Sequence, residues 1–402
     1  MPEPPASKPP LLVFADDWGR HPSSCQHLIR HLLSHRSVTW VNTIGTRPPR
    51  LDWGTARRVT GKLGQWLRKP NPPTPFPKWE GGENPLPCPL RGGMGEGLTV
   101  VSPKMWPSFR SRFGRNLNRR LILRSLIPIV EAMPEKPVVV TTLPLVADLV
   151  GRLPVARWVY YCVDDFSQWP GYDGETMRRM ERELVPGVDE VIAVSDTLVS
   201  HVANLGKPGR LLTHGVDLDF WRQSIASGIP GEFAGLQPPL VVFWGVVDRR
   251  TDLEFVRTLT TRLTRGTVVF VGPREDPDPA LFALPHVASH PAVAYDRLPA
   301  LAAAASVLVM PYVDRPVTRA MQPLKLKEYL ATGKPVVLRG LPATRPWADA
   351  CDVAETADEF AVKIVERIAT GLPDGQRMAR ERLNSEGWAV KAKKFEDWID
   401  HG

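Results

Sequence analysis

The residues with the clearest capacity for chemistry lie in the segment Gln322–Val337, QPLKLKEYLATGKPVV. Pro323 suits the first position of a helix, where its missing N–H costs nothing, and the exposed N–H groups of that turn form an anion site. Lys325 and Glu328 are three residues apart, so both side chains project from one side of this helix. A buried strand, Pro335–Leu338, follows after a glycine that ends the helix. The segment therefore predicts a cation and a carboxylate beside an anion-binding helix start. A solvated ion pair is the alternative interpretation.

The segment Gln322–Val337 lies within a longer pattern. Along the whole chain, short apolar runs alternate with helical patterns. Such alternation is typical of parallel βαβ units. The predicted strands of the first half are Leu11–Ala15, Val38–Asn42, Leu98–Val101, Val138–Thr141, Trp158–Val163, Glu190–Val194 and Leu211–Leu212. Those of the second half are Leu240–Trp244, Thr267–Val271, Val287–Ser289, Val307–Met310, Pro335–Leu338 and Cys351–Ala354. The fold class is therefore α/β, with two doubly wound, Rossmann-like domains.

The chain of 402 residues exceeds the size at which a single core stops growing, so we expect two domains. Asp217–Pro239 has little periodicity and is the expected linker. We predict an N-terminal domain over 1–225, with an irregular basic excursion at about 47–107, and a C-terminal domain over 226–385. Residues 386–402 are expected to form a helix that packs back across the junction. Doubly wound domains bind ligands beyond the carboxyl ends of their strands, so the two should face a cleft.

Composition narrows the class of protein further. The chain is 43% hydrophobic and carries four cysteines, Cys25, Cys88, Cys162 and Cys351, with no CxxC pairing. That spacing argues against a zinc site and against a disulfide framework. The proline-rich start offers no signal peptide, and no segment reaches about 18 uninterrupted apolar residues. We therefore expect a cytoplasmic location.

The net charge of +8 is unevenly placed. Between Gly45 and Ser125 there are sixteen basic residues against four acidic ones. Within this region, Asp52–Lys69 combines cations with apolar residues at helical spacing, a pattern typical of an interfacial helix on anionic lipid. We therefore expect membrane apposition, against the alternative of an ordinary amphipathic helix docked on its own domain. No nucleic-acid-binding module is present to position the charge, so nucleic acid is not an expected partner.

Five segments in order resemble one family. They are THGVDLDFW (Thr213–Trp221), WGVVDRRTDLEFV (Trp244–Val256), VVFVGP (Val268–Pro273), YDRLPALAAAASVLVMPY (Tyr295–Tyr312) and QPLKLKEYLATGKPVV. Together they resemble the GT-B glycosyltransferases of the family 4 type, which use nucleotide-sugar donors. FADDWGRHPSSCQHLIRHL (Phe14–Leu32) and ERELVPGVDEVIAVSDTLVSHV (Glu181–Val202) extend the resemblance more loosely into the first half.

The resemblance implies a donor site. Glu328 matches the glutamate that accepts hydrogen bonds from the donor ribose, and Arg250 and Lys325 match cations that neutralise the diphosphate. Fixed cations stabilise the charge that develops on a leaving nucleoside diphosphate, so both are catalytic candidates and no metal or other cofactor is expected. Gly245 would let the backbone approach the phosphates closely. The alternative for Arg249 and Arg250 is ordinary surface charge.

One departure from the family pattern concerns the donor sugar. Many members carry a second glutamate eight positions before the one that matches Glu328, and this chain has Ala320 there. Thr318, Arg319 and Gln322 are the candidates to replace it. His214 stands where the family usually has asparagine, and we interpret it as structural.

Acceptor candidates follow two of the predicted strands. Asp16 and Asp17 follow the first strand and Asp164 and Asp165 follow the fifth, so both pairs fall at carboxyl ends. A carboxylate there could take the proton of an acceptor hydroxyl or orient it, which makes Asp164 and Asp165 catalytic candidates. His21 is a further candidate for acceptor binding. The alternative is that adjacent aspartates cap loops.

These expectations combine into one leading hypothesis. The chain would transfer a sugar from a UDP- or GDP-sugar to a saccharide or lipid-linked acceptor in envelope or exopolysaccharide synthesis, at the inner face of the plasma membrane. Two alternatives stay open: a non-catalytic GT-B relative that acts as a membrane or partner-binding scaffold, and a GT-B sugar-nucleotide epimerase, because fold does not fix function.

Overall fold

The computed structural model describes residues 8–19, 23–42, 97–169, 171–223 and 228–401. By its internal contacts the chain divides into two compact units. The first comprises the described residues up to Thr213 together with Lys391–His401, and the second comprises those from His214 to Val390. Several predictions lie outside the described residues: the domain boundary at 225/226, His21, Cys88, the segment Asp52–Lys69 and most of the 47–107 excursion.

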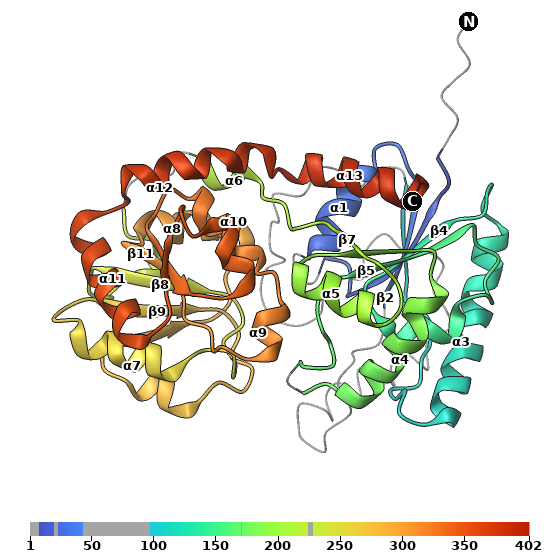
Figure 1. The fold of residues 1–402 in the computed structure, drawn as a ribbon, viewed down its shortest axis with the longest axis horizontal. Helices are drawn as coiled ribbons and strands as arrows, with labels where there is room; N and C mark the ends of the chain where they lie inside the picture. Colours follow the sequence, from blue (N-terminus) through green and yellow to red (C-terminus); the bar gives the residue numbers. More distant parts are fainter. Residues whose placement is uncertain (1–7, 20–22, 43–96, 170, 224–227, 402) are drawn as a thin grey trace, which may run out of the picture. The chain divides into compact units, whose positions relative to one another are not determined.

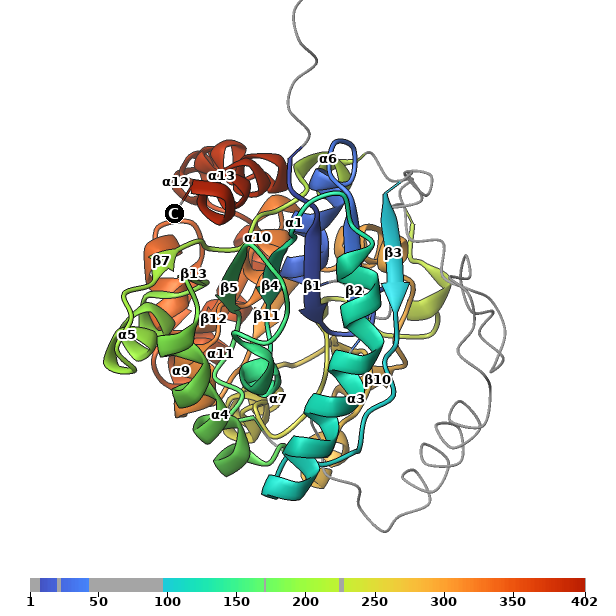
Figure 2. The same ribbon diagram turned by 90° about the vertical axis from the view of Figure 1, so that its right-hand side faces the viewer.

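The first unit is built on a parallel sheet whose seven described strands run in the order β3-β2-β1-β4-β5-β6-β7. The strands are β1 (Leu11–Ala15), β2 (Val38–Asn42), β3 (Leu98–Val101), β4 (Val138–Thr141), β5 (Arg157–Cys162), β6 (Glu190–Ala193) and β7 (Arg210–Leu211). The helices are α1 (Ser24–Leu32), α3 (Arg112–Glu131), α4 (Gly174–Gly187), α5 (Asp196–Asn204) and most of α13 (Trp388–His401). Figure 2 shows β1 and β2 with α3 in front of them.

Burial on both faces explains why these strands are continuous apolar runs. β1 is wholly buried and pairs in register with β2 on one side and β4 on the other. Ser23, Ser111 and Ser195 each accept a backbone N–H in the first turn of α1, α3 and α5, so the helix starts carry standard caps. No helix in the described ranges is long and apolar enough to cross a bilayer.

The second unit has a parallel sheet of six described strands in the order β10-β9-β8-β11-β12-β13. The strands are β8 (Leu240–Trp244), β9 (Thr267–Val271), β10 (Val287–His290), β11 (Val307–Met310), β12 (Val336–Arg339) and β13 (Asp352–Ala354). The α-helices are α6 (Leu218–Arg222), α7 (Leu253–Arg262), α8 (Leu298–Ala304), α9 (Pro316–Ala320), α10 (Leu324–Ala331), α11 (Ala357–Thr370) and α12 (Asp374–Ala379), and a 3₁₀ helix, η6 (Arg380–Ser385), follows α12. In Figure 1, α7 and α11 pack together on one side of this sheet, and α8 and α10 lie on the other.

Every predicted strand is present, with ends that differ by at most one residue. β12 begins at Val336 and not at Pro335, because proline has no N–H to donate to the ladder; its carbonyl still accepts the N–H of Leu308. Pro323 caps α10 and Leu324 is its first helical residue, since the extended ψ of 118° at Pro323 places it one position outside the helix. Both units are therefore doubly wound α/β domains.

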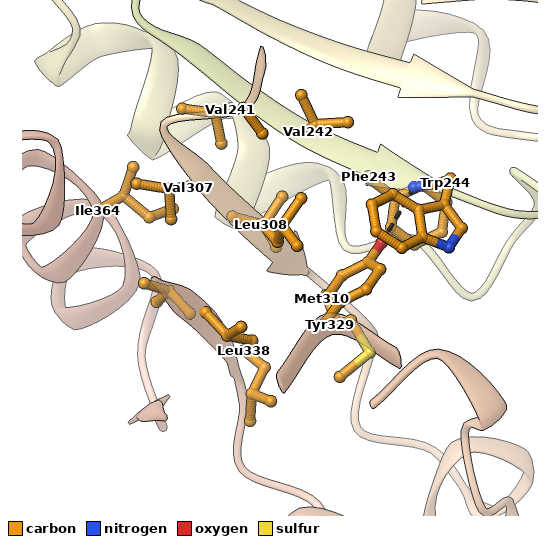
Figure 3. Packing of buried hydrophobic residues seen from close by; sticks show 14 of the residues in the cluster. Val241, Val242, Phe243, Trp244, Val307, Leu308, Met310, Tyr329, Leu338 and Ile364 are labelled. Atoms are coloured by element: carbon orange, nitrogen blue, oxygen red, sulfur yellow. Dashed lines mark hydrogen bonds between the residues drawn. The ribbon is translucent and has the colours of Figure 1, made fainter. Parts of the chain in front are cut away.

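One hydrogen bond in the core of the second unit joins α10 to the central strand. The backbone N–H of Trp244, the last residue of β8, donates to the hydroxyl of Tyr329 at 3.0 Å. The two rings meet edge to face with centroids 4.2 Å apart, and Tyr329 is fully buried (Figure 3). This contact sets where α10 lies along the carboxyl end of β8.

A buried lysine holds the other side of α10. Lys327 is 2% exposed, and its ammonium donates to the carbonyl of His214 and to the carboxylate of Glu386. The N–H of Val216 donates to the carbonyl of Glu386 at 3.0 Å. The segments near the start and the end of the second unit are thus both bonded to α10. The backbone carbonyl of His214 therefore has a structural role.

Removing the Tyr329 hydroxyl should loosen α10 without changing the shape of the core. In Tyr329→Phe the Trp244 N–H loses its acceptor inside a buried site, which should cost about 1–3 kcal/mol of unfolding free energy in urea titrations. An unchanged denaturation midpoint would contradict the role given to this bond.

Candidate functional site

Two glycines bring the loops after β8 and β9 into close contact. Gly245 has a φ of 130° and Gly272 a φ of 143°, a region that favours glycine. A Cβ at Gly272 would lie 2.1 Å from the carbonyl oxygen of Gly245, and the Gly245 N–H donates to Val271 at 2.9 Å. The close packing of the two loops therefore requires glycine at these positions. The same lack of a side chain at Gly245 lets a ligand approach the backbone at the carboxyl end of β8.

Lys325 extends from the first turn of α10 to Gly245. A Cβ at Gly245 would lie 2.3 Å from the Lys325 ammonium. That ammonium sits 4.1 Å from the ring centroid of Phe243 and 5.5 Å from that of Tyr312. Within the described residues Lys325 forms no salt bridge. The structure thus brings together Gly245, Lys325 and a helix start, as the sequence predicted.

Glu328 lies one turn further along α10 and is held by a tyrosine. The hydroxyl of Tyr295 donates to Oε1 of Glu328 at 2.8 Å. Burial raises the pKa of Glu328 above the ordinary glutamate value, and the hydrogen bond from Tyr295 and the charge of Lys325 partly oppose that rise. A partly buried carboxylate next to one cation and one hydroxyl donor is therefore placed to accept hydrogen bonds from a ligand.

An aromatic layer supports Tyr295 and Glu328. Phe220 stacks on Tyr295 with centroids 4.8 Å apart and planes at 6°, and Trp221 stacks on Trp244 at 5.5 Å and 8°. Trp221 also meets Tyr295 edge-on at 5.8 Å. Tyr295 was not among the site residues predicted from the sequence. Its position at the start of the fourth family-like segment was the signal that could have identified it.

Arg250 reaches the same carboxyl edge but already has an anionic partner. Its guanidinium binds Asp248, with Nε at 3.0 Å from Oδ1 and Nη2 at 2.8 Å from Oδ2. Its carbonyl accepts the N–H of Val313 at 2.8 Å, which ties the loop after β8 to the loop after β11. Arg250 is buried, so it is not ordinary surface charge; Arg249, by contrast, is exposed and pairs loosely with Asp276 at 3.4 Å.

Ala320 stands where many family members have a second glutamate, and the candidates to replace that glutamate lie in or next to α9. Their side chains differ in exposure and in hydrogen-bond partners. Thr318 is fully buried, and its hydroxyl bonds Arg315 and Val313 backbone atoms at the helix start, so it acts within the fold. Arg319 is exposed and binds both oxygens of Asp314. Gln322 and Ala320 are buried, at 9% and 5% exposure.

In the first unit, the loop after β1 is organised around Asp16. Its carboxylate accepts the Ser23 hydroxyl at 3.1 Å and the Gln26 amide at 2.8 Å, and its carbonyl accepts the Trp40 indole N–H at 2.9 Å. Asp17 contributes its carbonyl to the same Gln26 amide at 3.4 Å. Asp16 therefore closes the turn between β1 and α1.

The two aspartates after β5 are both partly buried. Asp165 accepts the Ser167 N–H at 3.0 Å and the Ser167 hydroxyl at 2.6 Å through one oxygen, an arrangement typical of a loop-capping aspartate. Asp164 lies two residues beyond the last residue of β5, Cys162.

A hydrogen-bonded cluster of Tyr160, Glu181 and His201 was not identified from the sequence. Glu181 on α4 accepts the Tyr160 hydroxyl at 2.7 Å through Oε1 and bonds His201 Nε2 at 2.8 Å through Oε2. The hydrogen bond to Glu181 raises the pKa of His201. Glu181 and His201 lie at opposite ends of one family-like segment, which the sequence alone could not show to be in contact.

Comparison with solved structures reveals similar architectures at low sequence identity. Sucrose-phosphate synthase from Thermosynechococcus elongatus superposes with a TM-score of 0.66 at 15% identity, over 97% of this chain and 98% of that one. Anabaena HepE, in complex with UDP and glucose, gives 0.61 at 12% identity over 98% and 100%. The trehalose-6-phosphate synthase OtsA gives 0.64 at 12% over 98% and 99%. These similarities show the GT-B fold, two Rossmann-like domains with parallel sheets.

Among curated proteins, the chain is similar to TuaH of Bacillus subtilis strain 168, described as a glycosyltransferase of teichuronic acid biosynthesis. The two are 25% identical over 178 residues, which span 42% of this chain and 45% of TuaH. The match thus covers less than half the length of that relative. No model of a known protein family matches the chain.

The His201–Glu181 pair makes stability depend on pH in a defined direction. Because the folded-state pKa of His201 is raised, the pair stabilises the fold below the ordinary histidine pKa of about 6.5, and this contribution is lost as pH rises through the raised value. Urea unfolding between pH 5.5 and 8.5 should show a larger loss of stability on going to high pH for the wild type than for His201→Gln. Parallel pH profiles for the two proteins would contradict this assignment.

Proposed function

We propose that the chain is a glycosyltransferase that takes its sugar from a nucleotide-sugar donor. The observation that carries this proposal is the meeting of Lys325, Glu328 and the bare backbone of Gly245 at the start of α10. These groups offer a cation, a carboxylate acceptor and a close backbone approach, which are complementary to the phosphates and the hydroxyls of a nucleoside diphosphate. The GT-B fold and the similarity to TuaH support the same class.

The donor would lie with its diphosphate at the helix start and its ribose further along α10. Lys325 and the N–H groups of the first turn would bind the phosphate oxygens, and Arg250, oriented by Asp248, would lie on the same edge of the sheet. Glu328 would accept the ribose hydroxyls, with Tyr295 holding its carboxylate. Gln322 and Arg319 stay candidates for contact with the sugar.

Transfer breaks the bond between the anomeric carbon and the diphosphate oxygen and forms a new bond from that carbon to an acceptor oxygen. The acceptor hydroxyl loses a proton, and we propose that one of the two carboxylates after β5, Asp164 or Asp165, would receive or orient it. The bond-breaking electrons pass to the diphosphate, whose charge Lys325 would stabilise. We propose that this stabilisation proceeds without a metal.

Two observations support a UDP-sugar and an envelope-type acceptor. HepE, a structural neighbour, has been solved in complex with UDP-glucose, and TuaH is described by a role in teichuronic acid biosynthesis. We therefore propose UDP-sugar as the donor ahead of GDP-sugar, a family 4-like mechanism, and a saccharide or lipid-linked acceptor of an extracellular polymer.

An exposed basic face on α3 supports a peripheral membrane location. Arg112, Arg120 and Arg124 recur at spacings of four or eight residues and are exposed, and Phe113 beside them is 72% exposed. Cations with an apolar side chain on one helix suit an anionic bilayer surface.

This membrane proposal predicts liposome flotation that depends on anionic lipid and declines with salt. Arg120→Glu combined with Arg124→Glu should weaken flotation, whereas Arg257→Glu on α7 should not. Flotation that ignores both lipid charge and salt would refute the proposal.

A second candidate is a GT-B scaffold that binds a membrane or partner without transfer. Ala320 favours it, because this buried position offers no carboxylate for a donor sugar. A calorimetric panel of UDP, GDP and their sugars separates the two candidates, since a scaffold should bind none of them.

Substitutions at the α10 start should weaken donor use in distinguishable ways. Glu328→Gln removes a charged acceptor and should weaken UDP binding by about 10- to 100-fold. Lys325→Met should lower kcat for transfer or donor hydrolysis by about 100-fold or more, because it removes charge stabilisation from the leaving group. Since burial raises the pKa of Glu328, wild-type UDP affinity should also fall on mild acidification.

The matched control is Glu254→Gln, an exposed carboxylate on α7, which should leave binding unchanged. Full donor binding and activity in both Glu328→Gln and Lys325→Met would exclude this site assignment.

A further inference from the structure

A pocket in the second unit lies at the opposite end of α10 from Lys325. Its volume is about 530 Å³, within the range of sites for small organic ligands. One wall is the last turn of α10 and its cap, Leu330–Lys334, and another is the face of η6 that carries Arg380 and Asn384. Trp221, Pro299 and Leu372 add apolar surface. All of these residues belong to the second unit.

The charged residues that line this pocket are mainly cations. They are Arg222, Lys334, Arg377 and Arg380, against one carboxylate, Glu381. Arg377 is exposed and only loosely paired with Asp374, at 3.6 Å. Arg222 donates to the Asn384 side chain at 3.1 Å, which leaves its charge without a carboxylate partner in the described part of the chain. The lining therefore has an excess of positive charge.

One of the cations that line the pocket, Arg380, is buried in the protein interior. The residue is 4% exposed, and its Nε and Nη1 donate to the carbonyls of Ala350 at 2.9 Å and Lys334 at 2.8 Å. Its Nη2 is buried and has no hydrogen-bond partner among the described residues. Burial lowers the pKa of Arg380 to about 10, and the nearby negative charge of Asp352 only partly opposes that shift.

Lys334, on the wall formed by the end of α10, is a second partly buried cation. Its ammonium donates to the carbonyl of Ala303 at 2.6 Å, and burial lowers its pKa. Buried polar groups are nearly always satisfied, and planar arginine groups match phosphate oxygens with two parallel hydrogen bonds. The pocket volume exceeds what a bare phosphate ion needs, so these cations suit an anionic group that is part of a larger molecule.

We propose that this pocket binds a small organic phosphate, with its phosphate group held by Arg377, Arg380 and Lys334, and that its occupant changes nucleotide binding at the other end of α10. The effect on nucleotide binding rests on the proposed donor site, whereas the binding of the organic phosphate does not. Trp221 lines the pocket, meets Tyr295 edge-on at 5.8 Å, and Tyr295 donates to Glu328. Two aromatic residues, Trp221 and Tyr295, and one helix, α10, thus connect the two sites.

The binding test uses the full chain without any nucleotide and follows its thermal midpoint with a hexose 6-phosphate, inorganic phosphate or the neutral hexose. The hexose 6-phosphate should raise the midpoint by about 2–4 °C at saturation, inorganic phosphate should need at least about tenfold higher concentration, and the neutral hexose should have no effect. No shift with the phosphate ester, or an equal shift with the neutral hexose, would overturn the proposal.

Three variants locate the effect. Arg377→Glu should abolish the shift of the thermal midpoint, because it replaces a cation of the pocket with an anion. Arg257→Glu on α7 lies outside the pocket and should preserve the shift. It is a matched control because both arginines are exposed and pair with a carboxylate three residues earlier in their helices. Lys325→Met should also preserve the shift, since the donor site is not involved. Loss in Lys325→Met with retention in Arg377→Glu would assign the binding to the donor site and refute the pocket.

Coupling is measured separately, as the dissociation constant of UDP with and without saturating hexose 6-phosphate. A change of threefold or more in the wild type that disappears in Arg377→Glu is the expected result. An unchanged constant would overturn the coupling and leave the binding result standing. Failure of UDP to bind at all would instead contradict the proposed function, whatever the result of the thermal test.

Discussion

The hydrogen bond from the Trp244 N–H to the Tyr329 hydroxyl is the contact on which the candidate site depends. It joins the carboxyl end of the central strand to the middle of α10, inside a core where an unmet N–H would be costly. Because Tyr329 is fixed there, Lys325 falls at Gly245 and Glu328 falls beside Tyr295. Lys327 bonds the carbonyl of His214 and the carboxylate of Glu386, which ties α10 to the segments near both ends of the unit.

The charges along α10 follow from this placement. Its start presents a lysine over aromatic faces with no salt bridge in the described chain, and its last turn forms one wall of a pocket lined by cations. Both ends therefore favour anions, but for different reasons: the first through helix-start N–H groups and one ammonium, the second through arginine and lysine side chains. The aromatic layer of Trp221 and Tyr295 lies between them.

The sheets and the order of the strands could be predicted because buried parallel strands are continuous apolar runs bounded by turn residues. Lys325, Glu328 and Gly245 could be predicted together because one short motif carries two of them. The role of Tyr295 could not, since it reaches Glu328 from a segment 33 residues away. The same limit applies to Asp248, which orients Arg250, and to Arg380, whose burial next to a pocket follows only from tertiary packing.

Some residues that were expected to bind a ligand use their side chains to bond nearby backbone groups. Thr318 caps a helix and Asp165 caps a loop, because short polar side chains satisfy nearby backbone groups as readily as they satisfy ligands. Sequence spacing alone does not separate these two uses. The exposure and hydrogen-bond partners of each side chain do.

A crystal structure of the full chain with UDP would show whether α10 holds the nucleotide. The diphosphate should lie beside the Lys325 ammonium and the Gly245 backbone, with the ribose hydroxyls on the carboxylate of Glu328. A nucleotide bound elsewhere, or bound here with its ribose away from Glu328, would contradict this placement.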